Sequence, residues 1–114
     1  MYKDDRVRLG HMLQSASEAL SFAEGRSRID VDRDRMLQHS LVRCIEIVGE
    51  AAVSISREFR GTVTSIPWAK LAGMRNRLVH AYHDVDPDIV WDTTTQDLPS
   101  LVAELKKLLA EPEP

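Results

Sequence analysis

Apolar residues recur every three or four positions along the chain, and no run of four to eight residues alternates apolar and polar as a half-buried strand does. The pattern therefore predicts an all-α protein. We expect a first helix over about residues 4–24 and a second of about 28 residues that ends before Gly61. A third helix is expected from near Pro67 to about Tyr82, then a short helix near 87–95 and, after a break at 97–99, a last helix.

Each long predicted helix carries an apolar stripe that should face a shared core. Because the predicted connections are short, neighbouring helices should be antiparallel. We expect an antiparallel up-and-down bundle of four main helices plus a short helix, in one domain over residues 1–110, with a frayed tail at 111–114. The stripes are Leu9, Leu13, Ala16, Leu20 and Ala23; Leu37, Leu41, Cys44, Val48, Ala52, Ile55 and Phe59; Leu71, Met74, Leu78 and Ala81; and Leu101, Leu105 and Leu108.

A few residues mark turns, caps and close contacts. Gly25 marks the exit from the first helix, and Asp30 or Asp32 is expected to cap the second. Gly49 lies in mid-helix, where Ala would be favoured by about 1 kcal/mol, so another backbone should approach closely there. The sequence 86–88, Asp-Pro-Asp, has the form of a new helix N-terminus.

Composition narrows the class of protein. The chain has 114 residues, of which 43% are hydrophobic and 29% charged, and this balance is typical of a folded globular domain. The single cysteine, Cys44, lies on an apolar stripe and is expected to pack in the core without a chemical role. Charges interrupt the first thirty residues, so we expect no signal peptide, no membrane span and a cytoplasmic location.

Charge is unevenly distributed, although the formal net charge is only −3. Residues 61–83 contain no Asp or Glu, whereas residues 84–104 contain no Lys or Arg. A basic segment beside an acidic one suggests a bounded anion site, and solvated helix faces of opposite sign are the alternative.

The most informative segment is 73–84, at the end of the third predicted helix. Asn76, His80 and His83 form a polar row opposite the core stripe, one turn after Gly73, whose missing side chain would admit a ligand or a partner backbone. Arg75 and Tyr82 share a second row, and Arg75 could converge with His80 on one anion because its side chain is long.

Three chemistries can be compared on this segment. The histidines and aspartates of 80–88 resemble metal ligands, but Ile89 and Thr95 stand where an EF-hand loop has Gly and Glu. No nucleophile elbow for acyl transfer is present. Phosphodiester chemistry fits better, because an arginine can neutralise charge on phosphate oxygens and a histidine can exchange a proton near neutral pH.

The string Arg75-Asn76-x-x-x-His80-x-Tyr82 resembles the motif of the HepT-like toxins in the HEPN superfamily. That motif is Arg, four residues, His, one residue and Tyr. Segments 35–37, 46–51, 66–68, 73–77 and 88–93 also look like this family, and the resemblance spans about residues 4–110.

The resemblance implies a metal-independent ribonuclease without a cofactor, the toxin of a toxin–antitoxin pair, acting as a homodimer whose motif helices meet. Arg75 and His80 match the catalytic pair, and Asn76 matches the polar residue after the arginine. Tyr82 matches the tyrosine to which an MntA-type minimal nucleotidyltransferase antitoxin adds AMP. We expect three further residues to bind substrate RNA: Lys70, Arg77 and His83.

The sequence is also compatible with two other functions. In a non-catalytic helical interaction module, Arg75 and His80 would merely pair with Glu46 or Glu50. The other alternative is a domain that binds a nucleotide without cleaving RNA. Glu46 and Glu50 share a helix face, which is either a solvated charged face or a support for the site.

Overall fold

The computed structural model describes residues 1–78 and 84–111. This part of the chain is helical and contains no β-strand, which confirms the all-α prediction. The helices are α1 (Lys3–Ala23), α2 (Arg28–Arg33), α3 (Arg35–Ser54), α4 (Arg57–Thr62), α5 (Trp68–Ala72), α6 (Met74–Leu78), α7 (Pro87–Asp92), the π-helical segment η2 (Thr93–Asp97) and α8 (Leu98–Ala110).

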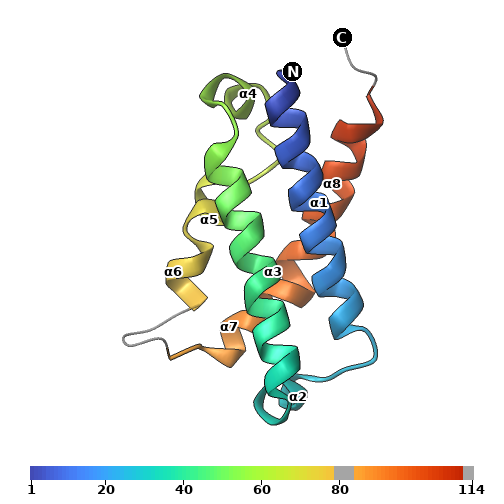
Figure 1. Ribbon diagram of the computed structural model, residues 1–114, viewed down its shortest axis with the longest axis vertical. Coiled ribbons are helices and arrows are strands. Elements are labelled where there is room, and N and C mark those ends of the chain that lie inside the picture. The colour runs from blue at the N-terminus through green and yellow to red at the C-terminus, as the bar shows by residue number, and fades with distance from the viewer. Residues whose placement is uncertain (79–83, 112–114) are drawn as a thin grey trace.

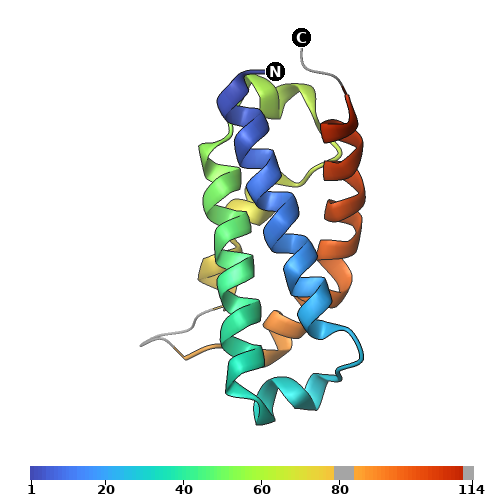
Figure 2. The same cartoon turned by 45° about the vertical axis from the view of Figure 1, so that its right-hand side comes forward.

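The chain runs alternately along the long axis of an elongated molecule of 47 × 30 × 19 Å. Figure 1 shows α1 and α3 antiparallel and side by side, with α5 and α6 returning along one flank and α7, η2 and α8 completing the bundle. The turned view in Figure 2 places α8 beside α1, with both described chain ends at one end of the bundle. The predicted up-and-down topology is therefore confirmed.

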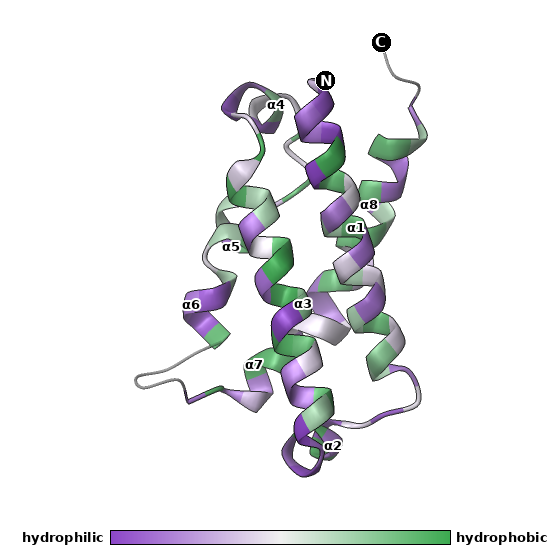
Figure 3. Ribbon diagram, viewed as in Figure 1, coloured by the Kyte–Doolittle hydropathy of each residue, from purple (hydrophilic) through white to green (hydrophobic). Residues whose placement is uncertain are grey.

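The predicted stripes form the core. In α1, Leu9 and Ala16 are fully buried, and Leu13, Leu20 and Ala23 pack partly buried against the core. The stripe of α3 is buried along its length, and Figure 3 shows green, apolar segments recurring along α3 between purple, polar ones. Leu101 and Leu105 of α8 are also buried. Among the described residues, no helix is both long and apolar enough to cross a membrane.

The prediction of one continuous second helix is wrong. The chain breaks at Asp34, where the backbone is extended and the carboxylate accepts the Leu37 N–H, and again near Ser56, which caps α4. The prediction that Asp30 or Asp32 caps this helix is also wrong. Asp34 caps α3, and Asp30 instead forms a capping box with Ser27 at the start of α2. Short polar side chains that bond to nearby N–H groups compete with continued helix, and here they end it.

Two other helix boundaries differ from the prediction. The third helix begins after Pro67 as expected but is interrupted at Gly73, whose ψ of −3° departs from helical geometry. The break expected at 97–99 does not occur, because η2 joins α7 to α8 and the Leu98 N–H donates to the Thr93 carbonyl. A π-helical widening reroutes the hydrogen bonds ahead of Pro99, so the helical path continues past a residue that lacks an N–H.

The buried carboxylate of Asp5 ties the start of α1 to the end of α3. Its two oxygens accept the Ser56 N–H at 2.8 Å and the Ser56 hydroxyl at 2.6 Å, and Asp5 is only 1% exposed. The Gly25 φ of 72° confirms the predicted turn after α1, since a positive φ favours glycine.

Candidate active site

The first half of the candidate motif lies on α6, which is anchored by two buried residues. Met74 and Leu78 are both fully buried, which confirms this part of the third stripe, whereas Arg75, Asn76 and Arg77 are exposed. α6 therefore presents three consecutive polar side chains to solvent. The remaining predicted residues, Ala81, His80, Tyr82 and His83, lie outside the described residues.

Gly49 allows the helix preceding α6 to approach α3 closely. A Cβ atom built at Gly49 would lie 3.0 Å from the Leu71 carbonyl oxygen of α5. This contact confirms the close backbone approach predicted for Gly49. By contrast, the nearest atom to a Cβ at Gly73 is the carbonyl oxygen of Ala69, at an ordinary 3.5 Å.

Arg75 forms an ion pair with α3. Its Nε atom lies 3.2 Å from Glu46 Oε2, with the Arg75 side chain 67% exposed and that of Glu46 22% exposed. Glu50, the other acidic residue on this face, lies 3.7 Å from Arg43. The structure thus assigns each of the two carboxylates its own arginine.

Lys70 points to a different part of the molecule from Arg75. Its Nζ atom donates to Asp97 Oδ1 of η2 at 3.0 Å, joining the basic segment to the acidic one. Both residues line a cavity of about 360 Å³ whose walls include Ser65, Met74 and Glu104. Two of the residues predicted to bind RNA thus differ. Lys70 is already paired with Asp97, whereas Arg77 is exposed and lies two residues after Arg75.

The backbone on both sides of residues 79–83 is held in place. The Asp86 N–H donates to the Leu78 carbonyl at 2.8 Å, and the Asp86 side chain caps α7, as predicted. Arg28 of α2 donates from Nε to Asp88 Oδ1 at 2.7 Å, and this hydrogen bond raises the pKa of Arg28. The sequence did not predict that Arg28 would hold Asp88 and so the start of α7. The two residues lie far apart in the chain, and no local spacing links them.

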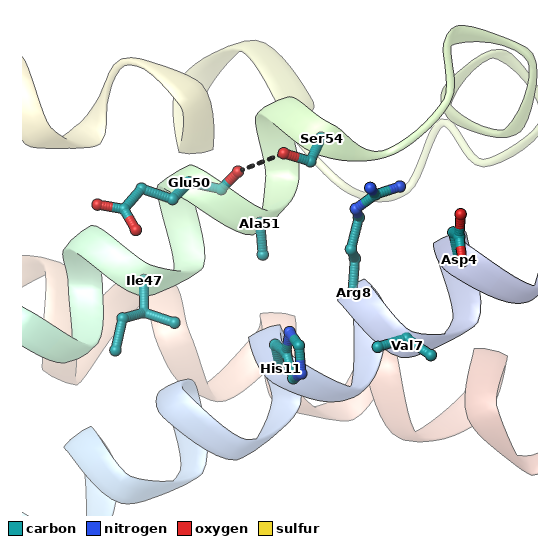
Figure 4. A pocket seen from close by; sticks show the side chains of 8 residues that line it. All are labelled: Asp4, Val7, Arg8, His11, Ile47, Glu50, Ala51 and Ser54. Atoms are coloured by element: carbon teal, nitrogen blue, oxygen red, sulfur yellow. Dashed lines mark hydrogen bonds between the residues drawn. The ribbon is translucent and has the colours of Figure 1, made fainter.

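Three other features of the described residues bear on the candidate chemistry. Residues 1–78 and 84–111 contain no group of three or more His, Cys, Asp or Glu side chains placed to hold a metal ion. Burial raises the pKa of the Cys44 thiol, which disfavours the reactive thiolate. A groove of about 400 Å³ lies between α1 and α3. In this groove the Ser54 hydroxyl donates to the Glu50 carbonyl, and the Glu50 carboxylate points away from Ser54 (Figure 4).

The described residues form a small helical bundle, and the first half of the candidate motif lies exposed on α6. The HepT-like ribonuclease family, described as "Ribonuclease HepT-like", matches residues 12–108. The chain belongs to this family.

Individual relatives agree with the family assignment. A protein of Caldanaerobacter subterraneus subsp. tengcongensis named "Putative RNase TTE0752" is 36% identical over 94% of this chain and 96% of its own length. "Probable ribonuclease HepT" of Thermococcus cleftensis is 36% identical over 84% of this chain and 91% of its own length. "Putative RNase MJ1216" of Methanocaldococcus jannaschii is 29% identical over 97% of this chain and 92% of its own length. No solved structure matches the chain.

Proposed function

We propose that this protein is a ribonuclease toxin that cleaves RNA without a metal ion, with Arg75 and His80 as its catalytic pair and Asn76 beside them. The observation that carries the proposal is the membership of residues 12–108 in a ribonuclease family. The exposure of Arg75 supports it, because a phosphate can reach the guanidinium without any rearrangement of the core.

The proposed reaction uses the 2′-hydroxyl of the RNA as the nucleophile. His80 accepts the hydroxyl proton as the oxygen attacks the adjacent phosphorus, and Arg75 stabilises the charge that develops on the phosphate oxygens. The bond from phosphorus to the 5′-oxygen then breaks, and that oxygen takes up a proton. The products are a 2′,3′-cyclic phosphate and a 5′-hydroxyl.

A homodimer would complete this chemistry. One protomer has a single motif histidine, whereas a two-fold dimer has two, so that one can act as base and the other as acid. We expect sedimentation at micromolar concentration to give the mass of a dimer. A monomer that still cleaves RNA would contradict this part of the proposal.

Arg77 and His83 are proposed to bind the RNA backbone near the reacting phosphate. Arg77 is exposed one residue beyond Asn76, which supports the assignment. Lys70 would contribute only by exchanging Asp97 for a phosphate, so its removal should affect RNA binding less than removal of Arg77.

Tyr82 is proposed as the site at which an MntA-type nucleotidyltransferase antitoxin silences the toxin by adding AMP. The added phosphate would place negative charge beside Arg75 and occupy the position of the substrate phosphate. Mass spectrometry of protein co-expressed with this partner should find AMP on the peptide that contains Tyr82. An unmodified peptide, with toxicity suppressed only while the partner stays bound, would contradict the modification and indicate steric capping.

A cleavage assay tests the ribonuclease function directly. The purified protein is incubated with RNA and with DNA of the same sequence, each with and without a chelator. We expect RNA to be cleaved equally well in both conditions and DNA to remain intact. Loss of RNA cleavage in chelator, or equal cleavage of DNA, would overturn the proposed chemistry.

The ion pair between Arg75 and Glu46 favours one alternative, a non-catalytic interaction or nucleotide-binding module that scaffolds a nucleotidyltransferase partner. In that function Arg75 would serve only to hold α6 on α3. Arg75→Ala should then weaken binding to the nucleotidyltransferase, and wild-type protein should leave RNA intact. A ribonuclease predicts the opposite result in the cleavage assay.

A further inference from the structure

The geometry points to Glu46 as a positioning residue that orients the Arg75 guanidinium for RNA cleavage. This inference rests on the proposed ribonuclease function and adds a residue outside the motif to its machinery. Glu46 comes from α3, a different helix from the one that carries Arg75.

The position of Glu46 is set by the core. It lies one turn before Gly49 on α3, and Arg75 lies one turn after Leu71. The absence of a side chain at Gly49 lets the Leu71 carbonyl approach α3. The close helix contact thereby brings the next turns, with Glu46 and Arg75, within ion-pair distance at 3.2 Å.

The geometry of the pair suits a guanidinium that must also bind a phosphate. Glu46 meets the Nε atom of Arg75, at the inner end of the guanidinium, and the terminal nitrogens carry the remaining N–H donors. Glu46 is the more buried partner, at 22% side-chain exposure, so packing restrains it more than the exposed arginine that it anchors. Holding one edge of a planar group restricts its orientation and lowers the entropy lost when a phosphate binds the other edge.

Stability is a weak explanation for the pair. Ion pairs with a largely exposed partner contribute little to the free energy of folding, and the Arg75 side chain is 67% exposed. Loss of Glu46 should therefore leave the fold intact. Its carboxylate also lowers the local positive potential, so its loss should not weaken the attraction of RNA to Arg75.

The chain offers a matched control. Glu50 lies one turn after Glu46 on the same face of α3, with the same charge and side-chain length, but it pairs with Arg43. Glu46→Gln and Glu50→Gln thus remove the same charge from neighbouring turns, and only the first removes the charged partner of Arg75.

The experiment measures kcat and KM for RNA cleavage, together with the melting temperature, for the full-length wild type, Glu46→Gln, Glu46→Asp and Glu50→Gln. We expect Glu46→Gln to lower kcat by roughly 10–100-fold, with KM unchanged or a few-fold lower and the melting temperature unchanged. Glu46→Asp should recover part of the loss, and Glu50→Gln should stay within about two-fold of wild type.

Two results would overturn the assignment while leaving the ribonuclease proposal intact. The first is a kcat for Glu46→Gln within two-fold of an active wild type. The second is a loss that appears equally in Glu50→Gln, or together with a higher KM and a lower melting temperature, which would indicate a structural role. An inactive wild type and Glu50→Gln would instead overturn the ribonuclease proposal and this inference with it.

Discussion

The helices α3 and α6 differ in length and in how much of each is buried. α3 has twenty residues, eight of them buried, and it forms the centre of the bundle. α6 has five residues, buries Met74 and Leu78, and exposes the three side chains between them. The contrast teaches that the candidate site is carried by a short element whose position depends on a longer one.

The two regions meet at contacts that differ in kind. Gly49 and Leu71 are in backbone contact deep in the molecule, whereas Glu46 and Arg75 pair near the surface. The first contact sets the distance between the helices, and the second is the one proposed to orient the Arg75 side chain. Substitutions can therefore test the helix contact at Gly49 and the ion pair of Glu46 with Arg75 separately.

The largest expected effect is on activity. Arg75→Ala should lower the rate of RNA cleavage by roughly 100–1,000-fold, because it removes the donor proposed to stabilise the charge that develops on the phosphate oxygens. The melting temperature should stay near that of wild type, since Arg75 is exposed. Arg57→Ala removes an exposed arginine from α4, outside the proposed site, and as the control it should keep the wild-type rate. Cleavage at the wild-type rate by Arg75→Ala would place the chemistry elsewhere.

The next largest effect is on stability, at the junction of α1 with α3. Asp5→Ala should lower the free energy of unfolding by about 2–3 kcal/mol, because it leaves the Ser56 N–H without its buried carboxylate acceptor. Its exposed neighbour supplies the control, and Asp4→Ala should change the free energy by less than about 0.5 kcal/mol. Urea unfolding measures both, and equal effects would mean that the Asp5 contacts contribute nothing.

Gly49→Ala should affect both α3 and α6. The new methyl group would meet the Leu71 carbonyl, and the cost of overpacking should exceed the gain of about 1 kcal/mol in helix propensity. We expect a net loss of about 1–2 kcal/mol and lower activity as α6 shifts. Gly10→Ala in α1 meets nothing within 4 Å and should instead raise stability. Stabilisation by both substitutions would show that α3 and α5 separate freely.

The smallest expected effect is an acid-dependent loss of stability at the start of α3. Hydrogen bonds from the Arg26 side chain and the Leu37 N–H hold the pKa of Asp34 below its ordinary value of 3.8. A carboxyl whose pKa is lower in the folded state stabilises the fold above its unfolded pKa, and this contribution is lost as pH falls through the folded pKa. Thermal melts should show that Asp34→Asn lowers stability at neutral pH and that this effect fades progressively as pH falls below about 4. A constant difference across that range would contradict this cause.

The sequence predicts the buried stripes well, because helical periodicity reports directly which residues avoid water. Leu41, Val48 and Leu105 are buried as their spacing indicates. The close backbone approach at Gly49 could also be predicted, since a glycine in mid-helix destabilises the helix unless a contact requires it. The breaks at Asp34 and Ser56 could not be predicted from the sequence. Short polar residues also occur within helices, and only the bonds of these side chains to the backbone N–H groups reveal a helix start.

The candidate site is predictable only in part. Spacing and the family motif identify Arg75, but the choice of Glu46 over Glu50 as its partner depends on how α6 packs on α3. The link from Arg28 to Asp88 likewise joins residues that only the folded chain brings together. The pairing of Lys70 with Asp97 shows that a basic segment can have its charge neutralised within the fold.

The most direct test of the central claim is the chemical identity of the new RNA ends. RNA cut by the wild-type protein in the presence of chelator is analysed by mass spectrometry, with Arg75→Ala as the matched sample. We expect a 2′,3′-cyclic phosphate and a 5′-hydroxyl from the wild type and uncut RNA from Arg75→Ala. A 3′-hydroxyl with a 5′-phosphate, or the same products from both proteins, would contradict cleavage by the 2′-hydroxyl at an Arg75 site.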